Sequence, residues 1–288
     1  MTEPARRSDF SAFSDRYGPW AVITGASDGI GREIARSAAE RGLDIVLVAR
    51  RRGRLEELAA ELEQIGASTR IVDADLGTPA GIEAVRRAAE DLDVGLLAAA
   101  AGFGTSGPFL DQSLGDELAM LDVNCGAVVS LAHHFGRRFV ERGRGGLVLM
   151  SSIVAFQGVP RAAHYAATKA WVQSFAEGLR AELGPAGVDV LASAPGPVAS
   201  GFAARANMKM DGAMDPRRVG AATLDALGRR GTVRPGWLSK VLGYSLQTLP
   251  RSGRRLIMAR VMDGMTRHQK PSGAGASRPA GAPEGASR

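Results

Sequence analysis

The sequence predicts an α/β protein built on one doubly wound parallel sheet. Short apolar runs, typical of strands buried on both faces, alternate with longer segments whose apolar residues recur at helical spacing. Because strands that alternate with helices are joined by right-handed crossovers, the sheet should be parallel and covered on both faces. With 288 residues and 45% hydrophobic content, the chain can bury one large core, and the repeated alternation favours a single domain.

Each predicted strand is a short apolar run. The expected strands cover residues 20–24, 44–49, 69–73, 94–99, 146–151 and 188–194. The first helix follows a glycine-bearing turn, because Ile30, Ile34 and Ala38 fall at helical spacing and Gly42 stands where a helix ends. Further helices are expected over residues 55–65, 82–91, 111–142, 162–183 and 216–227.

The two ends of the chain depart from this pattern. Residues 1–17 form a polar lead-in, and residues 18–267 form the domain, which closes with a small C-terminal helical extension. A flexible loop is expected over residues 201–213. Residues 268–288 are rich in Pro, Gly, Ala and Ser and too poor in large apolar residues to fold, so they predict a disordered tail.

Positive charge is concentrated toward the C-terminus. The net charge is +6 and the pI is about 10.1, but residues 229–288 hold 12 of the 36 Lys and Arg residues and 2 of the 30 Asp and Glu residues. Residues 1–228 therefore carry a net charge of −4, and no nucleic-acid partner is expected. The apolar and basic segment 237–260 suits a lid over an apolar substrate or, alternatively, weak contact with anionic lipid heads.

Two observations favour a cytoplasmic protein. The sequence has no run of about 18 consecutive apolar residues, and its charged first residues lack the apolar segment of a signal peptide. The single cysteine, Cys125, excludes an internal disulfide and a cysteine-rich metal site. No metal is expected.

The stretch from Tyr165 to Lys169 is the strongest indication of chemistry. Residues four apart share one face of a helix, so this spacing aims a phenol and an ammonium at one pocket. A nearby cation favours the phenolate and lowers the pKa of a tyrosine from its usual value of about 10. Ser152, from a separate segment, is placed to hold a substrate oxygen while Tyr165 gives or takes a proton. His164 is expected to cap the helix or lie on the surface rather than tune the pocket.

A glycine-rich turn connects the first strand to the first helix. Its residues are Thr24, Gly25, Ala26, Ser27, Asp28, Gly29, Ile30 and Gly31. Glycines at this place let the backbone approach a pyrophosphate, and the helix N-terminus presents N–H groups and a partial positive charge. The position between a strand and a helix therefore predicts a dinucleotide site.

The end of the second strand indicates which dinucleotide binds. An acid there would accept from a ribose 2′-hydroxyl, but Ala49 is followed by Arg50, Arg51 and Arg52. A guanidinium group pairs well with a 2′-phosphate, so NADP(H) is favoured over NAD(H). Arg50, nearest the strand end, is the candidate contact.

Six motifs in a fixed order resemble the short-chain dehydrogenase/reductase family, nearest the branch of 3-oxoacyl and hydroxysteroid reductases. They are Gly25-xxx-Gly29-x-Gly31, Asp75-Leu76, Asn124, Ser152, Tyr165-xxx-Lys169 and Pro195-Gly196, and they span about residues 18–200. The resemblance implies a Rossmann-like single domain in which Tyr165 is the general acid/base and Ser152 orients the substrate oxygen. It also implies that Lys169 holds the nicotinamide ribose and that Asn124 supports a proton relay.

The same resemblance implies further cofactor contacts. They comprise Asp75 at the adenine with Leu76 beside it, and Pro195, Gly196, Val198 and Ser200 around the nicotinamide. Two departures stand out. Ala99-Ala100 precedes Ala101-Gly102 where the family has two asparagines, so close approach of the cofactor is kept while asparagine hydrogen bonds are lost. Asp28 stands where NADP-preferring relatives often carry a basic residue.

The sequence thus predicts an NAD(P)-dependent oxidoreductase. It would transfer a hydride between the nicotinamide and a carbonyl or alcohol carbon of an apolar or acyl-type small molecule. The family resemblance also implies a homodimer or homotetramer. The alternative is a dinucleotide-binding regulatory protein that keeps the fold without turnover.

Overall fold

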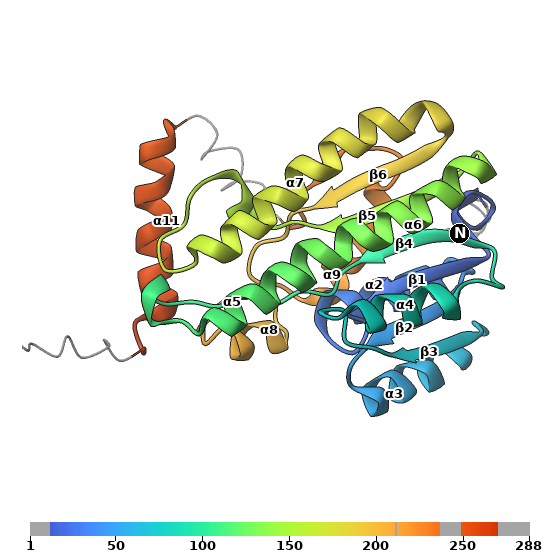
Figure 1. The fold of residues 1–288 in the computed structure, drawn as a ribbon, viewed down its shortest axis with the longest axis horizontal. Coiled ribbons are helices and arrows are strands. Elements are labelled where there is room, and N and C mark those ends of the chain that lie inside the picture. The colour runs from blue at the N-terminus through green and yellow to red at the C-terminus, as the bar shows by residue number, and fades with distance from the viewer. Residues whose placement is uncertain (1–11, 211, 237–248, 270–288) are drawn as a thin grey trace, which may run out of the picture.

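The computed structural model describes residues 12–210, 212–236 and 249–269. In this part of the chain, one parallel sheet has the strand order β3-β2-β1-β4-β5-β6-β7 (Figure 1). The strands are β1 (Trp20–Thr24), β2 (Asp44–Ala49), β3 (Thr69–Asp73), β4 (Val94–Ala99), β5 (Gly145–Met150), β6 (Val188–Ser193) and β7 (Thr232–Val233). The predicted doubly wound parallel sheet is confirmed. Its order reverses between β1 and β4, where open sheets of this kind bind ligands.

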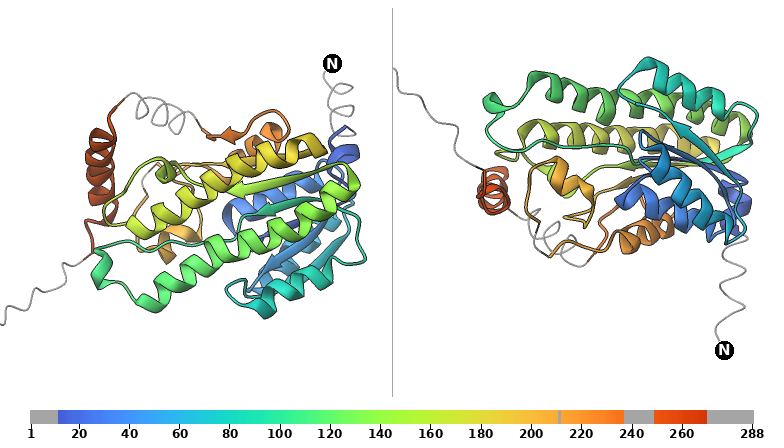
Figure 2. Two further views of the ribbon diagram at one scale, coloured as in Figure 1. Left: turned by 45° about the horizontal axis from the view of Figure 1, so that its top comes forward. Right: turned by 90° about the horizontal axis from the view of Figure 1, so that it is seen from below.

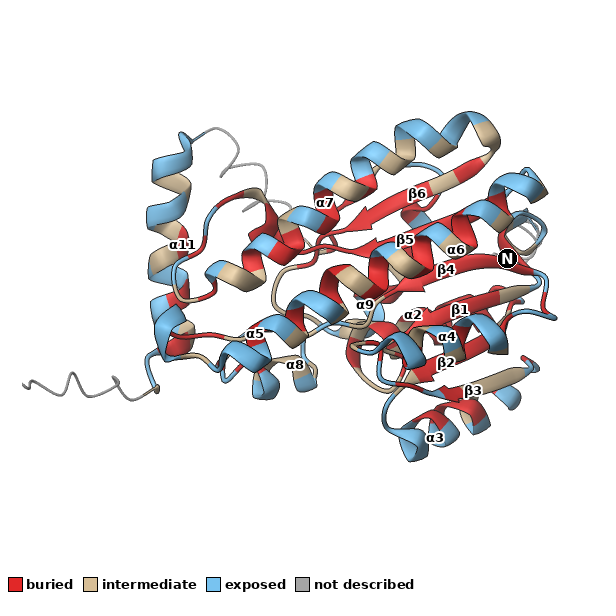
Figure 3. Cartoon of the chain, viewed as in Figure 1, coloured by how far each residue is buried: buried red, intermediate tan, exposed pale blue. Residues whose placement is uncertain are grey.

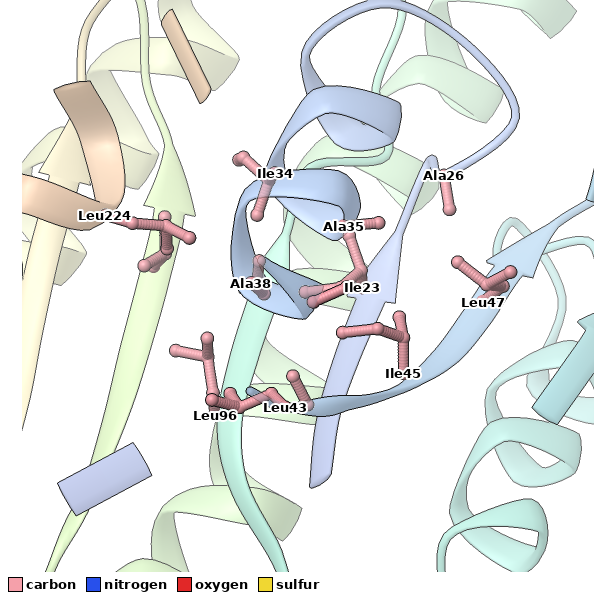
Figure 4. Close-up of a cluster of buried hydrophobic side chains, with 14 of the residues drawn as sticks. Ile23, Ala26, Ile34, Ala35, Ala38, Leu43, Ile45, Leu47, Leu96 and Leu224 are labelled. Atoms are coloured by element: carbon pink, nitrogen blue, oxygen red, sulfur yellow. The ribbon is translucent and has the colours of Figure 1, made fainter. Parts of the chain in front are cut away.

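Apolar side chains project from both faces of the central strands. Ala21 and Ile23 of β1 belong to one core cluster, part of which is shown in Figure 4, and Val22 belongs to the other. The first cluster is covered by α2 (Gly29–Ala39), α3 (Arg52–Glu63) and α9 (Pro216–Ala226), and the second by α4 (Pro79–Ala88), α6 (Ala127–Arg142) and α7 (Ala163–Leu183). Burial on both faces explains why the strands appear as continuous apolar runs in the sequence.

A third apolar cluster lies beyond the carboxyl ends of β5 and β6. It joins η3 (Ile153–Phe156), the start of α7, the residues around α8 (Gly201–Arg205) and α11 (Arg251–Thr266). α11 buries Met258 and Met262 in this cluster and exposes its other side, at one end of the molecule (Figures 2 and 3). The C-terminal helical extension therefore packs at the end of the sheet where the predicted site residues gather.

Two predicted segments differ in local structure. The helix expected over residues 111–142 is divided into η1 (Phe109–Asp111), α5 (Leu114–Leu121), a π-helical turn η2 (Asp122–Gly126) and α6. The loop expected over residues 201–213 contains α8, whose first turn is capped because the Ser200 hydroxyl accepts from the N–H of Phe202. Such short elements carry too few periodic positions to be read from sequence.

The predicted domain boundaries also shift. Tyr17, expected in the lead-in, is buried and donates to the Asp189 carboxylate at 2.7 Å. Gln269, expected in the tail, donates to the Ser106 hydroxyl at 2.7 Å. The remaining predictions for the lead-in, the lid segment and the tail fall on residues 1–11, 237–248 and 270–288, which lie outside the described residues.

The helical run Leu114–Arg142 is long and apolar enough, by length and composition, to cross a membrane. In the structure its α6 part packs on the sheet through Leu131, Phe135 and Phe139, which are buried in the second core cluster. The apolar character of this run is therefore explained by the core of the domain.

Candidate active site

Ser152, Tyr165 and Lys169 come together at the carboxyl end of β5. Ser152 follows the strand and begins η3, whereas Tyr165 and Lys169 occupy successive turns of α7. The Ser152 hydroxyl lies close enough to the Tyr165 phenol to lower its pKa, and the Lys169 ammonium lies 5.8 Å from the centre of the Tyr165 ring. The spacing predicted from sequence therefore places these three groups in one site.

Burial sets the protonation of this site. Loss of hydration raises the pKa of Tyr165 to about 12, although the neighbouring Ser152 hydroxyl lowers it in part. Burial also lowers the pKa of Lys169 to about 8, and its ammonium donates to the Met150 carbonyl at 2.8 Å. We expected Lys169 to bring the tyrosine pKa below its ordinary value, and the structure shows the opposite direction because loss of hydration is the largest influence on the phenol.

Asn124 holds the loop that follows β4. It is fully buried in the π-helical turn, where its amide donates to the Phe103 carbonyl at 2.9 Å and to the Thr168 hydroxyl at 3.0 Å. Its carbonyl oxygen accepts from the N–H of Phe103 at 3.1 Å. A π-helical turn is often found at a functional site, and here it directs Asn124 toward α7. The proton-relay role of Asn124 stays a prediction.

The loop after β4 compensates in part for its missing asparagines. The Thr24 hydroxyl donates to the Ala98 carbonyl at 3.4 Å and accepts from the N–H of Ala101 at 3.0 Å. A Cβ atom added to Gly102 would lie 2.9 Å from Asn124 Oδ1 and 3.3 Å from Lys169 Nζ. The small residues at this place are therefore required by the groups that approach them.

The glycine-rich turn has the geometry expected of a dinucleotide cradle. Gly25 has a φ of 70°, and a Cβ atom there would lie 2.9 Å from the Ala100 carbonyl oxygen. α2 begins at Gly29, and the Asp28 side chain accepts from the N–H of Gly29 at 2.7 Å. The turn opens at the switch point between β1 and β4, so its residues fit a bound pyrophosphate.

Two arginines flank this turn. Arg50 Nη1 lies 3.9 Å from Asp75 Oδ2, whereas Arg51 donates to the Ser27 hydroxyl at 3.1 Å and lies 3.6 Å from Asp28 Oδ2. Both guanidinium groups are exposed. The sequence favours Arg50 as the phosphate contact, which stays a prediction, and in the structure Arg51 contacts the glycine-rich turn directly.

The segment after β6 forms the opposite wall of the site. The Pro195 carbonyl accepts from the N–H of Ile153 at 3.0 Å, and Val198 forms a bridge with Met214. Asp28 Oδ2 accepts from the N–H of Gly201 at 2.9 Å, which connects this segment to the glycine-rich turn. The sequence suggested only a cofactor role for Asp28, and the structure shows that it joins the two walls.

The remaining predicted residues lie at the edges of the site. The Asp75 carboxylate accepts from the N–H of Gly77 at 3.0 Å, and Leu76 is buried in the core. Phe202 was missed by sequence reasoning: its ring lies 5.3 Å, centre to centre, from the ring of Tyr165. An aromatic residue shortly after Pro195-Gly196 was the available signal, but its orientation depends on the fold of α8.

This arrangement has a clear chemical capacity. A phenol whose pKa is about 12 carries its proton at neutral pH, and the hydroxyl beside it can bind the same substrate oxygen. The buried Lys169 cation nearby stabilises negative charge that develops at this site. The site is therefore suited to proton transfer at a carbonyl or alcohol oxygen beside a dinucleotide cradle.

Comparison with known proteins agrees with this geometry. The short chain dehydrogenase family profile matches residues 19–211. A 7beta-hydroxysteroid dehydrogenase of Clostridium sardiniense is 30% identical over 79% of this chain and 89% of its own length. A very-long-chain 3-oxoacyl-CoA reductase of Pyrenophora tritici-repentis is 30% identical over 82% of this chain and 76% of its own length. A short-chain dehydrogenase from Sphingobium yanoikuyae, solved in complex with NADPH, superimposes with a TM-score of 0.74 at 33% identity over 84% of this chain and 95% of that one. The chain therefore belongs to the short-chain dehydrogenase family of NAD(P)-dependent oxidoreductases.

Proposed function

We propose that this enzyme is an NADP(H)-dependent reductase or dehydrogenase that uses Tyr165 as its general acid/base. The observation that carries the proposal is the convergence of Ser152, Tyr165 and the buried Lys169 at the carboxyl end of β5. The cofactor supplies the hydride when bound. Ser152 orients the substrate oxygen, Tyr165 delivers its proton, and the Lys169 ammonium stabilises the phenolate that forms.

The substrate is proposed to be an apolar or acyl-type carbonyl compound or the corresponding alcohol. Phe202 and the apolar residues of the third cluster, among them Val159 and Met258, lie beside Tyr165. Apolar surroundings favour the body of such a molecule, while Ser152 and Tyr165 bind its oxygen. The names of the two curated relatives, a hydroxysteroid dehydrogenase and a 3-oxoacyl-CoA reductase, support the same class.

The direct test is consumption of NADPH with a panel of carbonyl compounds. The panel should hold aldehydes, ketones, a 7-oxosteroid and long-chain 3-oxoacyl thioesters, with NADH as the competing cofactor. Turnover of at least one member with NADPH supports the proposal. Tight NADPH binding without turnover of any member would favour the regulatory alternative instead.

The pKa values predict opposite pH profiles for the two directions. Carbonyl reduction needs protonated Tyr165 and charged Lys169, so its kcat should hold at neutral pH and fall above about 8 as Lys169 loses its proton. Alcohol oxidation needs the Tyr165 phenolate, whose fraction grows tenfold per pH unit below a pKa of about 12, so this direction should accelerate as pH rises. Initial rates in both directions across neutral to alkaline pH check the prediction. Oxidation that slows throughout that range would contradict it.

Removing Arg50 and Arg51, which flank the glycine-rich turn, should weaken NADPH binding more than NADH binding. A charge-assisted hydrogen bond contributes about 1.5–3 kcal/mol, so we expect Arg50→Ala with Arg51→Ala to raise the NADPH Kd by about 10- to 100-fold or more while the NADH Kd changes little. Arg54→Ala is the matched control, because Arg54 is also exposed but pairs with Glu57 at 3.0 Å on α3. Equal losses of NADPH and NADH affinity would place the arginines away from the 2′-phosphate. Fluorescence titration measures both constants.

α11 is proposed to act as a lid that closes the apolar side of the site. Its inner side packs through Met258 and Met262, and its outer side exposes Arg251, Arg255 and Arg260. These arginines are compatible with the weak lipid contact that the composition allowed. Co-sedimentation with phosphatidylserine vesicles that salt weakens would support lipid contact, and equal binding to neutral vesicles would count against it.

A homodimer or homotetramer and a cytoplasmic location stay predictions. Val129 and Val140 of α6 and Trp171 of α7 are exposed apolar residues on helices that cover the same side of the sheet. Burying them against a second copy would remove them from water. Light scattering at several concentrations tests the assembly.

A further inference from the structure

Glu117 on α5 is a buried carboxylate for which the proposed chemistry has no use. Its side chain is 4% exposed. Oε1 accepts from the Thr105 hydroxyl at 2.6 Å, and Oε2 lies 2.6 Å from Nδ1 of His164. A buried carboxylate is unfavourable unless its oxygens are paired, so these two contacts are needed to keep Glu117 in its buried position. They also indicate that His164 carries a proton on Nδ1 and donates it to Glu117.

One partner of Glu117 adjoins Tyr165 in sequence, and the other follows a residue that adjoins Tyr165 in space. His164 directly precedes Tyr165 in the first turn of α7. Thr105 directly follows Gly104, where an added Cβ atom would lie 3.0 Å from Cδ2 of the Tyr165 ring. Glu117 therefore joins the turn that carries the phenol to the loop that packs against the ring of that phenol.

The start of α7, like those of α3 and α11, has no side-chain cap of its own. No side chain caps it at Ala162, and its first turn holds no acidic residue. Side chains do cap α2, α4, α5 and α9. A negative charge near a helix N-terminus stabilises that helix, so Glu117 supplies from α5 what the sequence of α7 does not provide.

We propose that Glu117 is a positioning residue for Tyr165, acting through His164 and Thr105. This inference rests on the proposed function, because it assigns Glu117 a part in the same reaction. Both oxygens of Glu117 are paired within the protein, so its proposed role is indirect. It holds the first turn of α7 and the loop after β4 at the separation that lets the phenol meet Ser152 and the substrate oxygen together.

The test compares Glu117→Ala, His164→Ala and their double variant in the full chain. Small displacements of a catalytic group cost up to about 100-fold in rate, so we expect kcat for the best carbonyl substrate of the panel to fall by about 10- to 100-fold in each variant. The double variant should lose no more than Glu117→Ala, because the contact that His164→Ala removes is one of the two that Glu117→Ala already removes. The NADPH Kd should stay unchanged. His164→Asn, whose amide keeps a donor near the place of Nδ1, should recover much of the lost kcat.

Asp116→Asn is the matched control, because Asp116 neighbours Glu117 on α5 but forms an exposed ion pair with Arg205 at 3.2 Å. Its kcat should equal that of the unchanged enzyme. Unaltered kcat in Glu117→Ala would overturn the proposal, and so would additive losses in the double variant or no recovery in His164→Asn. Glu117→Gln, which keeps the shape and one acceptor, replaces Glu117→Ala if the latter does not fold.

Hydrogen exchange supplies a readout that needs no turnover. Amides of residues 162–169 should exchange faster in Glu117→Ala than in the unchanged protein, while those of the β-strands stay protected. Faster exchange in an enzyme that reduces no carbonyl compound would support the structural role of Glu117 and contradict the proposed function. Unchanged exchange rates of residues 162–169 in an active enzyme would contradict the positioning role of Glu117 and leave the proposed function intact.

Discussion

Tyr165→Phe is expected to abolish turnover while leaving NADPH binding intact. The variant keeps the ring that packs against Phe202 but removes the hydroxyl that we propose transfers the proton. General acid/base catalysis contributes about 100- to 10,000-fold, so kcat should fall by at least that range. Steady-state rates with the best substrate and NADPH fluorescence titration measure the two quantities on one preparation.

Tyr17→Phe is the matched control for this experiment. Tyr17 is another buried tyrosine, and its hydroxyl donates to Asp189 at 2.7 Å, far from Ser152 in the sheet. It should lose about 1 kcal/mol of stability with kcat unchanged, because a single buried hydrogen bond contributes about that much. Residual turnover in Tyr165→Phe above a tenth of normal would assign the proton transfer to another group.

Gly31→Ala is expected to damage both stability and cofactor binding. A Cβ atom at this position would overlap the carbonyl oxygen of Gly25, so either α2 or the glycine-rich turn must shift. Overpacking of this kind costs about 1–3 kcal/mol of the free energy of unfolding, and the displaced turn should bind NADPH at least about tenfold more weakly. Thermal unfolding with and without NADPH measures both effects.

Gly53→Ala separates close packing from the general effect of replacing a glycine in a helix. Gly53 lies in α3, and an added Cβ atom there meets no other atom within 4 Å. Its stability should be unchanged or rise by at most about 1 kcal/mol, because alanine favours helix more than glycine does. A Gly31→Ala variant that behaves like Gly53→Ala would show that the turn adapts and that close packing at Gly31 is not needed.

Most of the fold could be predicted because its signals are local. The run from Asp44 to Ala49 is apolar throughout, as a strand buried on both faces must be, and Ile30, Ile34 and Ala38 repeat at the period of one helix face. The glycine-rich turn could be assigned because it stands between two such elements. α8 and β7 were missed, since five and two residues are too few for a period to show.

The pKa of Tyr165 could not be predicted from its neighbours in sequence. The spacing of Tyr165 and Lys169 predicted one face of a helix, and the structure confirms it. The direction of the pKa shift was wrong, because it depends on how much water the surrounding residues exclude. Burial depends on how the whole molecule packs, so the four-residue spacing of Tyr165 and Lys169 does not indicate it.

The sequence by itself determined the layered sheet, the glycine-rich turn and the common helix face of Tyr165 and Lys169, because each is encoded by residues close together in the chain. Only the tertiary structure decided how these parts are held. Asn124 reaches Phe103 and Thr168, Asp28 reaches Gly201, and Glu117 reaches His164. These contacts join residues 21 to 173 positions apart, so they form only when the chain has folded, and those of Asn124 and Glu117 are buried or partly buried, where polar groups must find partners within the protein.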